Sequence, residues 1–223
     1  MKINGTDIAA FGAKLLQYTV TPAAVENRYT LGYNSAFFTL MDTEIKTKTL
    51  TVTLHVAGDT LEHTSRNSTL LLASLYQESE LEMPDGFMYR CVCTACSSSR
   101  IMDTLHEVVV TCEAVQHLAL VTVPLSAGNN VVHCTSTLPT EYTLAVTPAA
   151  DAESCTVAGI TVRQLTAGKA VVIDGMRKTV TQEGANKFMD TDLTAFPRLV
   201  PGDNTVAVSG NVDVVLTYYP TFL

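Results

Sequence analysis

The feature that most constrains the fold of this sequence is an alternation of apolar and polar side chains with a period of two residues. Between Thr49 and Val56, leucine and valine occupy every second position, and threonine and histidine fill the positions between them. Successive side chains of a β-strand point to opposite faces, so this pattern predicts a strand with one buried and one solvated face. The hydrophobic fraction of 47% and the charged fraction of 16% favour a β-rich globular protein over a disordered or helical one.

One segment of the first half has a helical pattern instead. Its apolar residues recur at helical spacing, and residues ahead of them offer oxygens that can cap a helix N-terminus. The apolar stripe consists of Leu71, Leu72, Leu75 and Tyr76, and the capping candidates are Thr64, Ser65 and Asn67. We therefore predict one main helix over about residues 65–78.

After this helix, the sequence predicts a hairpin over Leu81–Cys96 that turns at Pro84-Asp85-Gly86, since proline and glycine favour turns. A loop at Ser97-Ser98-Ser99 is expected to lead into a long strand over Leu105–Val115. Residues 1–40 show little periodicity, and Tyr18–Leu40 is expected to be an irregular segment.

In the second half, turn-forming residues interrupt candidate strands about every eight to twelve positions, which is typical of a β-sandwich or jelly roll. The candidate strands are Leu118–Pro124, Asn130–Ser136, Tyr142–Thr147, Ser154–Val162, Ala170–Ile173 and Thr179–Thr181. A closing hairpin is expected to turn at Gly210-Asn211, with Val206 and Val208 before the turn and a return strand to Tyr218 after it. The size of 223 residues fits two domains, which we expect at residues 1–118 and 119–223.

The run Phe196–Thr205 precedes this closing hairpin. Proline fixes its backbone φ angle and glycine tolerates a positive one, so the run is expected to form a rigid corner. Phe196 and Leu199 would anchor the core of the sandwich. The motif residues of this corner and of the last strand are Phe196, Pro197, Leu199, Pro201, Gly202, Asn204 and Tyr218.

Charge and targeting signals restrict the class of protein. The net charge is −8 and neither half carries a basic patch, which argues against nucleic-acid binding through phosphate neutralisation. The N-terminus lacks the apolar core of a signal peptide, and no apolar run reaches transmembrane length. We expect a protein made in a cytoplasm, not inserted into a membrane, whose six cysteines are reduced thiols.

Candidate sites for chemistry are few. Cys91, Cys93 and Cys96 with Cys112 form the only metal-like cluster, but Cys96 is expected to face away from Cys91 and Cys93, so buried free thiols fit better. His55 and His106 are expected to be exposed on alternating strands. Glu78, Glu80 and Glu82 fit a solvated face better than a paired-carboxylate site. Tyr218 and Tyr219 could stack on a carbohydrate, although a buried and an exposed edge tyrosine fit better. No nucleophile, phosphate-binding or cofactor motif is present, so we predict no enzyme, no cofactor and no metal.

The C-terminal segment resembles a known family. The residues that carry this resemblance are Ile173-Asp174-Gly175, Lys178–Thr181, Gly184-Ala185-Asn186, the run Phe196–Thr205, and a tyrosine at 218 or 219 near the end. This pattern resembles the closing segment of siphophage distal tail (Dit) proteins. The first half resembles the family more loosely, through Ile3-Asn4-Gly5, the alternating strand, the single helix and a strand pair that closes near Cys112.

The resemblance implies a virion protein at the tail tip, synthesised in the bacterial host cytoplasm. Its N-terminal domain would form a ring, expected to be hexameric, and its C-terminal domain would be a galectin-like β-sandwich. The ring would join the tail tube protein to the tail-associated tip protein (Tal) and let DNA pass, with acidic residues of the first domain facing the lumen. The segment Tyr18–Leu40 could bridge subunits through Tyr29, Tyr33, Phe37 and Phe38, or it could be a loop folded onto its own domain.

Other functions remain open from the sequence. The second domain could be a carbohydrate-binding β-sandwich, which predicts glycan affinity and exposed aromatic residues on a concave face. The chain could also be a tail tube subunit, which would be acidic and ring-forming but usually has only one domain. A hydrolase is the weakest alternative.

Overall fold

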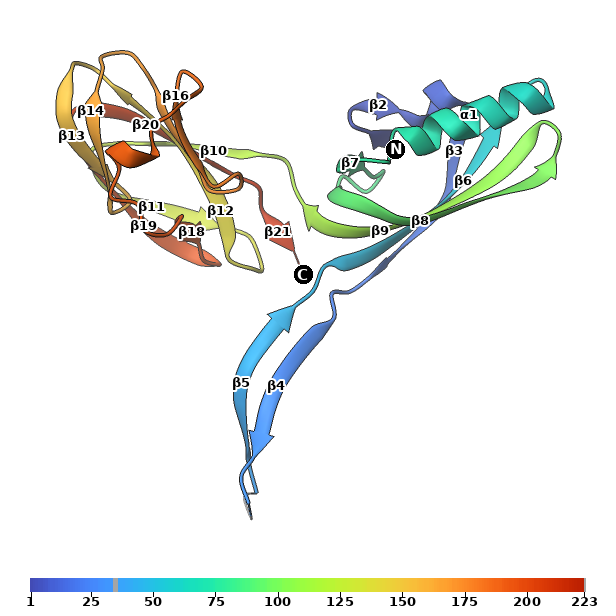
Figure 1. The fold of residues 1–223 in the computed structure, drawn as a ribbon, viewed down its shortest axis with the longest axis horizontal. Coiled ribbons are helices and arrows are strands. Elements are labelled where there is room, and N and C mark those ends of the chain that lie inside the picture. Colours follow the sequence, from blue (N-terminus) through green and yellow to red (C-terminus); the bar gives the residue numbers. More distant parts are fainter. Residues whose placement is uncertain (34–35, 223) are drawn as a thin grey trace. The chain divides into compact units, whose positions relative to one another are not determined.

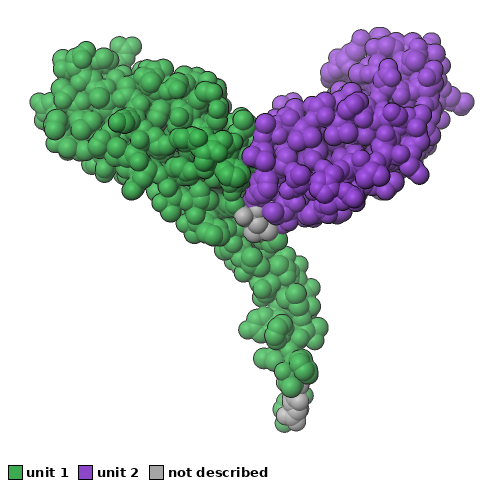
Figure 2. All heavy atoms as spheres, turned by 180° about the vertical axis from the view of Figure 1, so that it is seen from behind, with its two compact units in different colours: residues 1–117, 223 green, residues 118–222 purple. Residues whose placement is uncertain are grey.

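The computed structural model describes residues 1–33 and 36–222, which divide into two compact units, Met1–His117 and Leu118–Phe222 (Figure 2). Each unit has its own hydrophobic core. The described residues contain one α-helix, two short 3-10 helices and otherwise β-strands (Figure 1). The predicted mainly β fold with one main helix is therefore confirmed.

Unit 1 is built on one antiparallel sheet with the strand order β2-β1-β7-β8-β9-β6-β3. A separate two-stranded ribbon is formed by β4 and β5. The elements are β1 (Lys2–Ile3), β2 (Thr6–Asp7), the 3-10 helix η1 (Ile8–Phe11), β3 (Ala13–Thr21), β4 (Val25–Leu31), β5 (Phe38–Ile45), β6 (Lys48–Ala57), α1 (Leu61–Ala73), β7 (Ser79–Glu82), β8 (Met88–Met102) and β9 (Leu105–His117).

The predicted alternating strand is β6, at the centre of this sheet. Leu50, Val52, Leu54 and Val56 are buried, whereas the threonines and His55 between them are only half-buried. The neighbouring strand β9 alternates in the same way, and α1 packs against both strands. The apolar face of the sheet thus forms the core of unit 1 with the helix as its cover.

The helix begins and ends earlier than predicted. It spans Leu61–Ala73, and its N-cap is Thr60, whose hydroxyl oxygen accepts a hydrogen bond from the backbone N–H of His63 at 3.2 Å. Leu71 and Leu75 are buried as expected, but Tyr76 lies beyond the helix and is 71% exposed. The sequence offers several Ser, Thr and Asn residues that can cap a helix, so the prediction chose a later one.

The hairpin with its turn at Pro84-Asp85-Gly86 is confirmed by β7 and β8. The predicted loop at Ser97-Ser98-Ser99 is wrong, because β8 continues through these serines to Met102 and pairs with β9. Serine has no strong preference against an edge strand, and here the long partner strand supplies the hydrogen bonds.

Unit 2 consists of two antiparallel sheets and is a β-sandwich. One sheet has the order β10-β20-β12-β15-β16-β17, with β18 also paired to β12, and the other has the order β11-β19-β13-β14. The elements are β10 (Val121–Leu125), β11 (Gly128–Cys134), β12 (Thr140–Pro148), β13 (Ala152–Val157), β14 (Ile160–Leu165), β15 (Val171–Asp174), β16 (Thr179–Gln182), β17 (Ala185–Asn186), the 3-10 helix η2 (Phe188–Asp190), β18 (Arg198–Leu199), β19 (Gly202–Ser209), β20 (Val212–Tyr218) and β21 (Thr221–Phe222).

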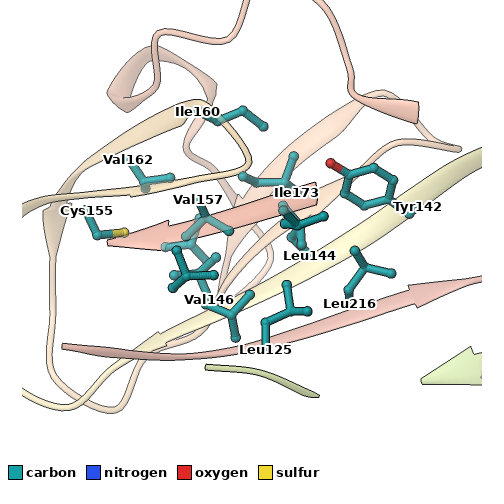
Figure 3. Close-up of a cluster of buried hydrophobic side chains, with 14 of the residues drawn as sticks. Leu125, Tyr142, Leu144, Val146, Cys155, Val157, Ile160, Val162, Ile173 and Leu216 are labelled. Carbon is teal, nitrogen blue, oxygen red and sulfur yellow. The ribbon is translucent and has the colours of Figure 1, made fainter. Parts of the chain in front are cut away.

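The core of unit 2 lies between these sheets. Leu144 and Val146 of β12 and Leu216 of β20 come from one sheet, while Cys155 and Val157 of β13 come from the other. Figure 3 shows their side chains converging on one cluster. The packing of two antiparallel sheets across an apolar interior is the arrangement expected of a sandwich.

Two strand predictions for unit 2 are wrong in an informative way. The expected strand Ser154–Val162 is a hairpin, because Ala158 and Gly159 both adopt positive φ and reverse the chain. The expected closing hairpin does not form, because β19 and β20 belong to different sheets and pair with other strands. Gly210-Asn211 therefore carries the chain from one sheet to the other, which period-2 patterns cannot distinguish from a hairpin turn.

Candidate assembly surfaces

The segment expected to bridge subunits is an ordered β-ribbon. The expectation of an irregular segment over Tyr18–Leu40 is wrong for the described residues, because β3 extends to Thr21 and Val25–Leu31 of β4 then pair with Phe38–Ile45 of β5; residues 34 and 35 of the segment lie outside the described residues. Every residue of both strands is exposed. We call this ribbon, residues 25–33 and 36–45, the arm (Figure 1).

The two faces of the arm differ in chemistry. Cross-strand partners share a face, and one face carries Tyr29 opposite Leu40 and Leu31 opposite Phe38. Val25 opposite Ile45 extends this face, and these six residues are between 41% and 67% exposed. The other face carries Glu26, Arg28 and Thr30. A bulge after Arg28 keeps the apolar residues of β5 in phase with those of β4.

The apolar face of the arm is also hollowed. A depression of about 480 Å³ is lined by Asn27, Tyr29, Leu31, Phe38 and Leu40. The rings of Tyr29 and Phe38 meet edge to face with centroids 5.7 Å apart. Tyr33 and Phe37, near the end of the arm, are 98% and 82% exposed. A contiguous exposed apolar patch is typical of an interaction site.

Unit 1 also carries two open strand edges. Strand β3 is the last strand of the sheet on one side. On the other side, β7 pairs only with the first part of β8, from Met88 to Cys91. Among the residues that the structure describes, no strand lies beside the outer edge of β8 from Val92 to Met102. Backbone N–H and C=O groups on such edges can pair with another chain.

The run Phe196–Thr205 is a structural corner of unit 2. Leu199 is buried in β18, and Phe196 packs against the core. The side chain of Asn204 ties the corner together: its Oδ1 accepts from the N–H of Val200 at 2.8 Å, and its Nδ2 donates to the carbonyl oxygens of Val200 and Gly202 at 2.8 and 3.0 Å. Gly202 has a φ of 92°, which favours glycine. Pro197 and Pro201 flank β18.

A second corner of the same construction was missed by the sequence reading. The side chain of Asn130 accepts from the N–H of Ser126 at 2.9 Å and donates to the carbonyl oxygens of Ser126 and Gly128 at 2.8 and 3.2 Å. Gly128 has a φ of 101°. The two Gly-x-Asn corners begin the paired strands β11 and β19, at opposite ends of their ladder. The shared spacing of glycine and asparagine was the signal in the sequence.

Tyr218 is a core residue. It is 2% exposed, and its hydroxyl group donates to the carbonyl oxygen of His133 at 3.0 Å. Its ring is therefore not available for stacking on a sugar. Tyr219 is half-buried.

His106 and the three glutamates Glu78, Glu80 and Glu82 of unit 1 differ in burial. His106 was expected to be exposed, but it is only 8% exposed, because it shares the face of β9 that α1 covers. Its Nδ1 lies 3.4 Å from Ser68 Oγ. The three glutamates lie on solvated positions: Glu78 pairs with Arg90, Glu82 pairs with Lys2 at 2.9 Å, and Glu80 is exposed.

The cysteines of β8 and β9 form a thiol cluster. Cys91 and Cys112 are buried, Cys93 is half-buried and Cys96 is exposed. A hydrogen bond between the thiols of Cys112 and Cys91 lowers the pKa of Cys91 and raises that of Cys112, and burial raises the pKa of Cys93. Within residues 1–33 and 36–222, no group of three or more His, Cys, Asp or Glu residues is arranged to hold a metal ion. In the same part of the chain, no helix has the length and apolar character needed to cross a membrane.

Comparison with known proteins defines the class. Residues 135–222 match the siphovirus-type tail component, C-terminal domain, which is the Dit family model of phage SPP1. No curated protein sequence matches the chain. Residues 135–222 thus match a domain found in siphovirus-type tail components.

Solved structures extend the likeness to the whole chain. The crystal structure of Dit (gp 19.1) from phage SPP1, described as a hub adsorption apparatus of phages that infect Gram-positive bacteria, matches with a TM-score of 0.79 and 13% identity, over 100% of this chain and 98% of that one. The phage P2 baseplate in its activated conformation, with Ca or with Sr, matches with a TM-score of 0.60 and 9% identity, over 96% of this chain and 92% of that one. The predicted resemblance to the Dit family is confirmed: residues 135–222 match the family's C-terminal domain, and the chain as a whole has the fold of the SPP1 Dit protein.

Proposed function

We propose that this chain assembles into a ring at the tip of the phage tail, where the ring joins the tail tube to a tail-associated tip protein and lets DNA pass. The observation that carries the proposal is that unit 1 presents two different open edges of one sheet together with an apolar arm. A ring requires a heterologous contact, in which each subunit offers two different patches to its two neighbours.

The directions of the strands suit a continuous sheet between neighbours. All adjacent strands from β8 through β9 and β6 to β3 are antiparallel, so β8 and β3 run in opposite directions. A β3 strand of one subunit placed beside β8 of the next would therefore continue the antiparallel alternation. Repetition of that contact around the ring would pair both the β3 edge and the open part of the β8 edge in every subunit.

The side chains of the β8 edge do not protect it from pairing. Proteins commonly shield exposed edges with charged residues, prolines or a short strand length. From Val92 to Ser99 this edge has no charged residue and no proline, and its side chains are mostly small. Arg100 is the first charge along it. This composition fits an edge that is covered in the assembled particle.

The arm would add a second contact between subunits. Its apolar face exposes Tyr29, Leu31 and Phe38 to water, which is unfavourable in free energy, and burial against a neighbour would remove this unfavourable exposure. Tyr33 and Phe37 would extend this contact from the end of the arm. The arm is thus our candidate for the bridging element.

The sheet face opposite α1 would line the bore. On β6 this face carries Thr51 and Thr53, and on β9 it carries Glu107, Thr111 and Glu113. Unit 1 has 8 Lys and Arg residues against 13 Asp and Glu residues, a net charge of −5. Hydroxyl and carboxylate groups without a basic patch would repel the phosphates of passing DNA and not retain them.

We further propose that one face of the ring meets the tail tube protein and the other meets the tail-associated tip protein. These partners follow from the likeness to Dit hub proteins, and the particle would carry the chain at its tail tip after synthesis in the host cytoplasm.

The experiment measures the mass of the assembly by native mass spectrometry and analytical ultracentrifugation, for the chain alone and with the tube and tip proteins of the same phage. We expect a ring of six subunits. Tyr29→Lys should abolish it, because the charge lies on the apolar face of the arm. The matched control is Thr30→Lys. It puts the same charge on the next residue of β4, which lies on the polar face of the arm, and it should leave the ring intact.

A chain that stays monomeric at high concentration and in the presence of both partners would overturn the ring. An intact ring in Tyr29→Lys would remove the arm from the interface and leave the open edges as its basis, and equal loss of assembly in both variants would contradict a contact specific to the apolar face. Stacking of many rings into a tube, with no affinity for the tip protein, would favour a tail tube subunit.

A further inference from the structure

Four thiols of unit 1 share one face of the sheet. Cys91 and Cys93 lie two residues apart on β8, and Cys112 lies on β9 directly opposite Cys93. A bulge between Cys93 and Ala95 shifts the phase of β8, so Cys96 becomes the partner of the buried Val110. The expectation that Cys96 faces the other way was therefore wrong, because strict alternation does not account for the extra residue of a bulge.

The pair Cys93 and Cys112 has the geometry of a cross-strand disulfide. Residues directly opposite in an antiparallel pair have Cα atoms about 4.5–5.5 Å apart, within the range of about 4.4–6.8 Å that disulfides span. Cys91 is opposite Ala114, so its relation to Cys112 is diagonal, at about 7–8 Å. Cys93 is the pair's half-exposed member, and Cys112 is fully buried.

We propose that Cys93 and Cys112 form an intramolecular disulfide when the protein leaves a reducing environment and meets a small-molecule disulfide. The bond would join β8 to β9 where β8 has no second neighbour among the described strands. It would hold the open edge strand on the sheet.

The reaction balances with oxidised glutathione as the oxidant. The thiolate of Cys93, which solvent reaches, attacks one sulfur of glutathione disulfide, and one glutathione thiolate leaves and takes up a proton. The thiolate of Cys112 then attacks Cys93 Sγ in the mixed disulfide and displaces the second glutathione. Two protein thiols are oxidised to one disulfide, and one glutathione disulfide is reduced to two glutathione thiols.

The experiment uses the full chain, purified with a reductant and then incubated with excess oxidised glutathione. Thiols counted after unfolding should fall from six to four, because two of the six cysteines are joined. Trypsin cleaves after Arg90 and Arg100, and a glutamyl endopeptidase cleaves after Glu107 and Glu113. Mass spectrometry without reduction should therefore find residues 91–100 linked to residues 108–113. The midpoint of thermal unfolding of unit 1 should rise by about 5 °C.

The peptide of residues 91–100 contains three cysteines, so matched variants are needed to identify which of them is bonded to Cys112. Cys93→Ser should abolish the linked peptide, whereas Cys91→Ser and Cys96→Ser should retain it. Cys112→Ser should also abolish it, and if that buried substitution prevents folding, the half-exposed Cys93→Ser decides the question. The proposal is overturned if all six thiols persist, if the link survives Cys93→Ser, or if glutathione stays on Cys93 without closure.

Discussion

Unit 2 and the arm are both antiparallel β-structures, yet they bury their side chains in opposite ways. Along β12, from Thr140 to Pro148, every second residue is buried against the second sheet. Along β4 and β5, every residue is exposed, including six large apolar ones on one face. Backbone pairing is comparable in the two regions, so the difference lies in what covers the apolar face.

This difference shows which region can stand alone. A two-stranded ribbon is marginally stable in water, because its hydrogen bonds replace bonds to water with little net gain. A sandwich adds the burial of apolar surface between two sheets, at about 25 cal/mol per Å². The fold of unit 2 therefore depends on its own core, while the arm gains its cover only from another surface. Four predictions test this contrast.

The largest effect is expected in the core of unit 2. Leu216→Ala should lower the free energy of unfolding of unit 2 by about 2–5 kcal/mol, because the fully buried side chain leaves a cavity between the sheets. The neighbouring Val215 points to the other face and is 36% exposed, so Val215→Ala should cost less than about 1 kcal/mol. Urea unfolding followed by circular dichroism, with hydrogen exchange to separate the units, measures both. Similar losses for the two variants would contradict the sandwich core.

The next effect is the response of unit 2 to high pH. Burial raises the pKa of Tyr142 from 10.0 to about 12, and burial also raises the pKa of Tyr218. A raised folded pKa stabilises the protonated folded form, so this contribution is complete below pH 10 and is lost between about pH 10 and 12. For Tyr142 the loss is about 2–3 kcal/mol. Tyr142→Phe should flatten the fall in stability over this interval, measured by urea unfolding at pH 8 and pH 11. An unchanged slope would mean that Tyr142 ionises without unfolding.

A smaller effect is expected at the two Gly-x-Asn corners. Asn204→Ala should destabilise unit 2 by about 1–3 kcal/mol, because the backbone groups of Val200 and Gly202 lose their side-chain partner. Asn130→Ala removes the corresponding bonds at the other end of the ladder and should cost a similar amount. The control is Asp203→Ala, on the exposed face beside Asn204. A loss for only one of the two asparagines would show that the corners are not equivalent.

The sequence predicted the parts of the fold that local patterns encode. The alternation around Leu54 located β6, and Pro84-Asp85-Gly86 located the turn between β7 and β8. It could not predict that β19 and β20 separate into different sheets, because strand partners are set by contacts far apart in sequence.

The candidate surfaces were predicted only in part. The aromatic residues Tyr29 and Phe38 drew attention to the arm, but their common face follows from the register of β4 and β5. The bulge after Arg28 then brings Val25 and Ile45 onto the same face, which alternation alone does not reveal. The open edge of β8 was hidden by the serine run, which was expected to be a loop. Neither a free edge nor a register is a property of one segment, so both required the assembled sheet.

The smallest effect on stability is expected in the arm. Phe38→Ser should change the free energy of unfolding of unit 1 by less than about 0.5 kcal/mol, because the side chain is 67% exposed and is not among the described residues that form or pack against the core of unit 1. The same substitution should weaken assembly strongly if the arm's apolar face lies against a neighbour. Thr39→Ser, on the opposite face, is the matched control and should alter neither property. If Phe38→Ser leaves folding unchanged but prevents assembly, the apolar face of the arm serves contact between subunits, whereas the core of unit 2 serves the stability of its own unit. A marked loss of unit 1 stability in Phe38→Ser would instead mean that the arm supports its own subunit.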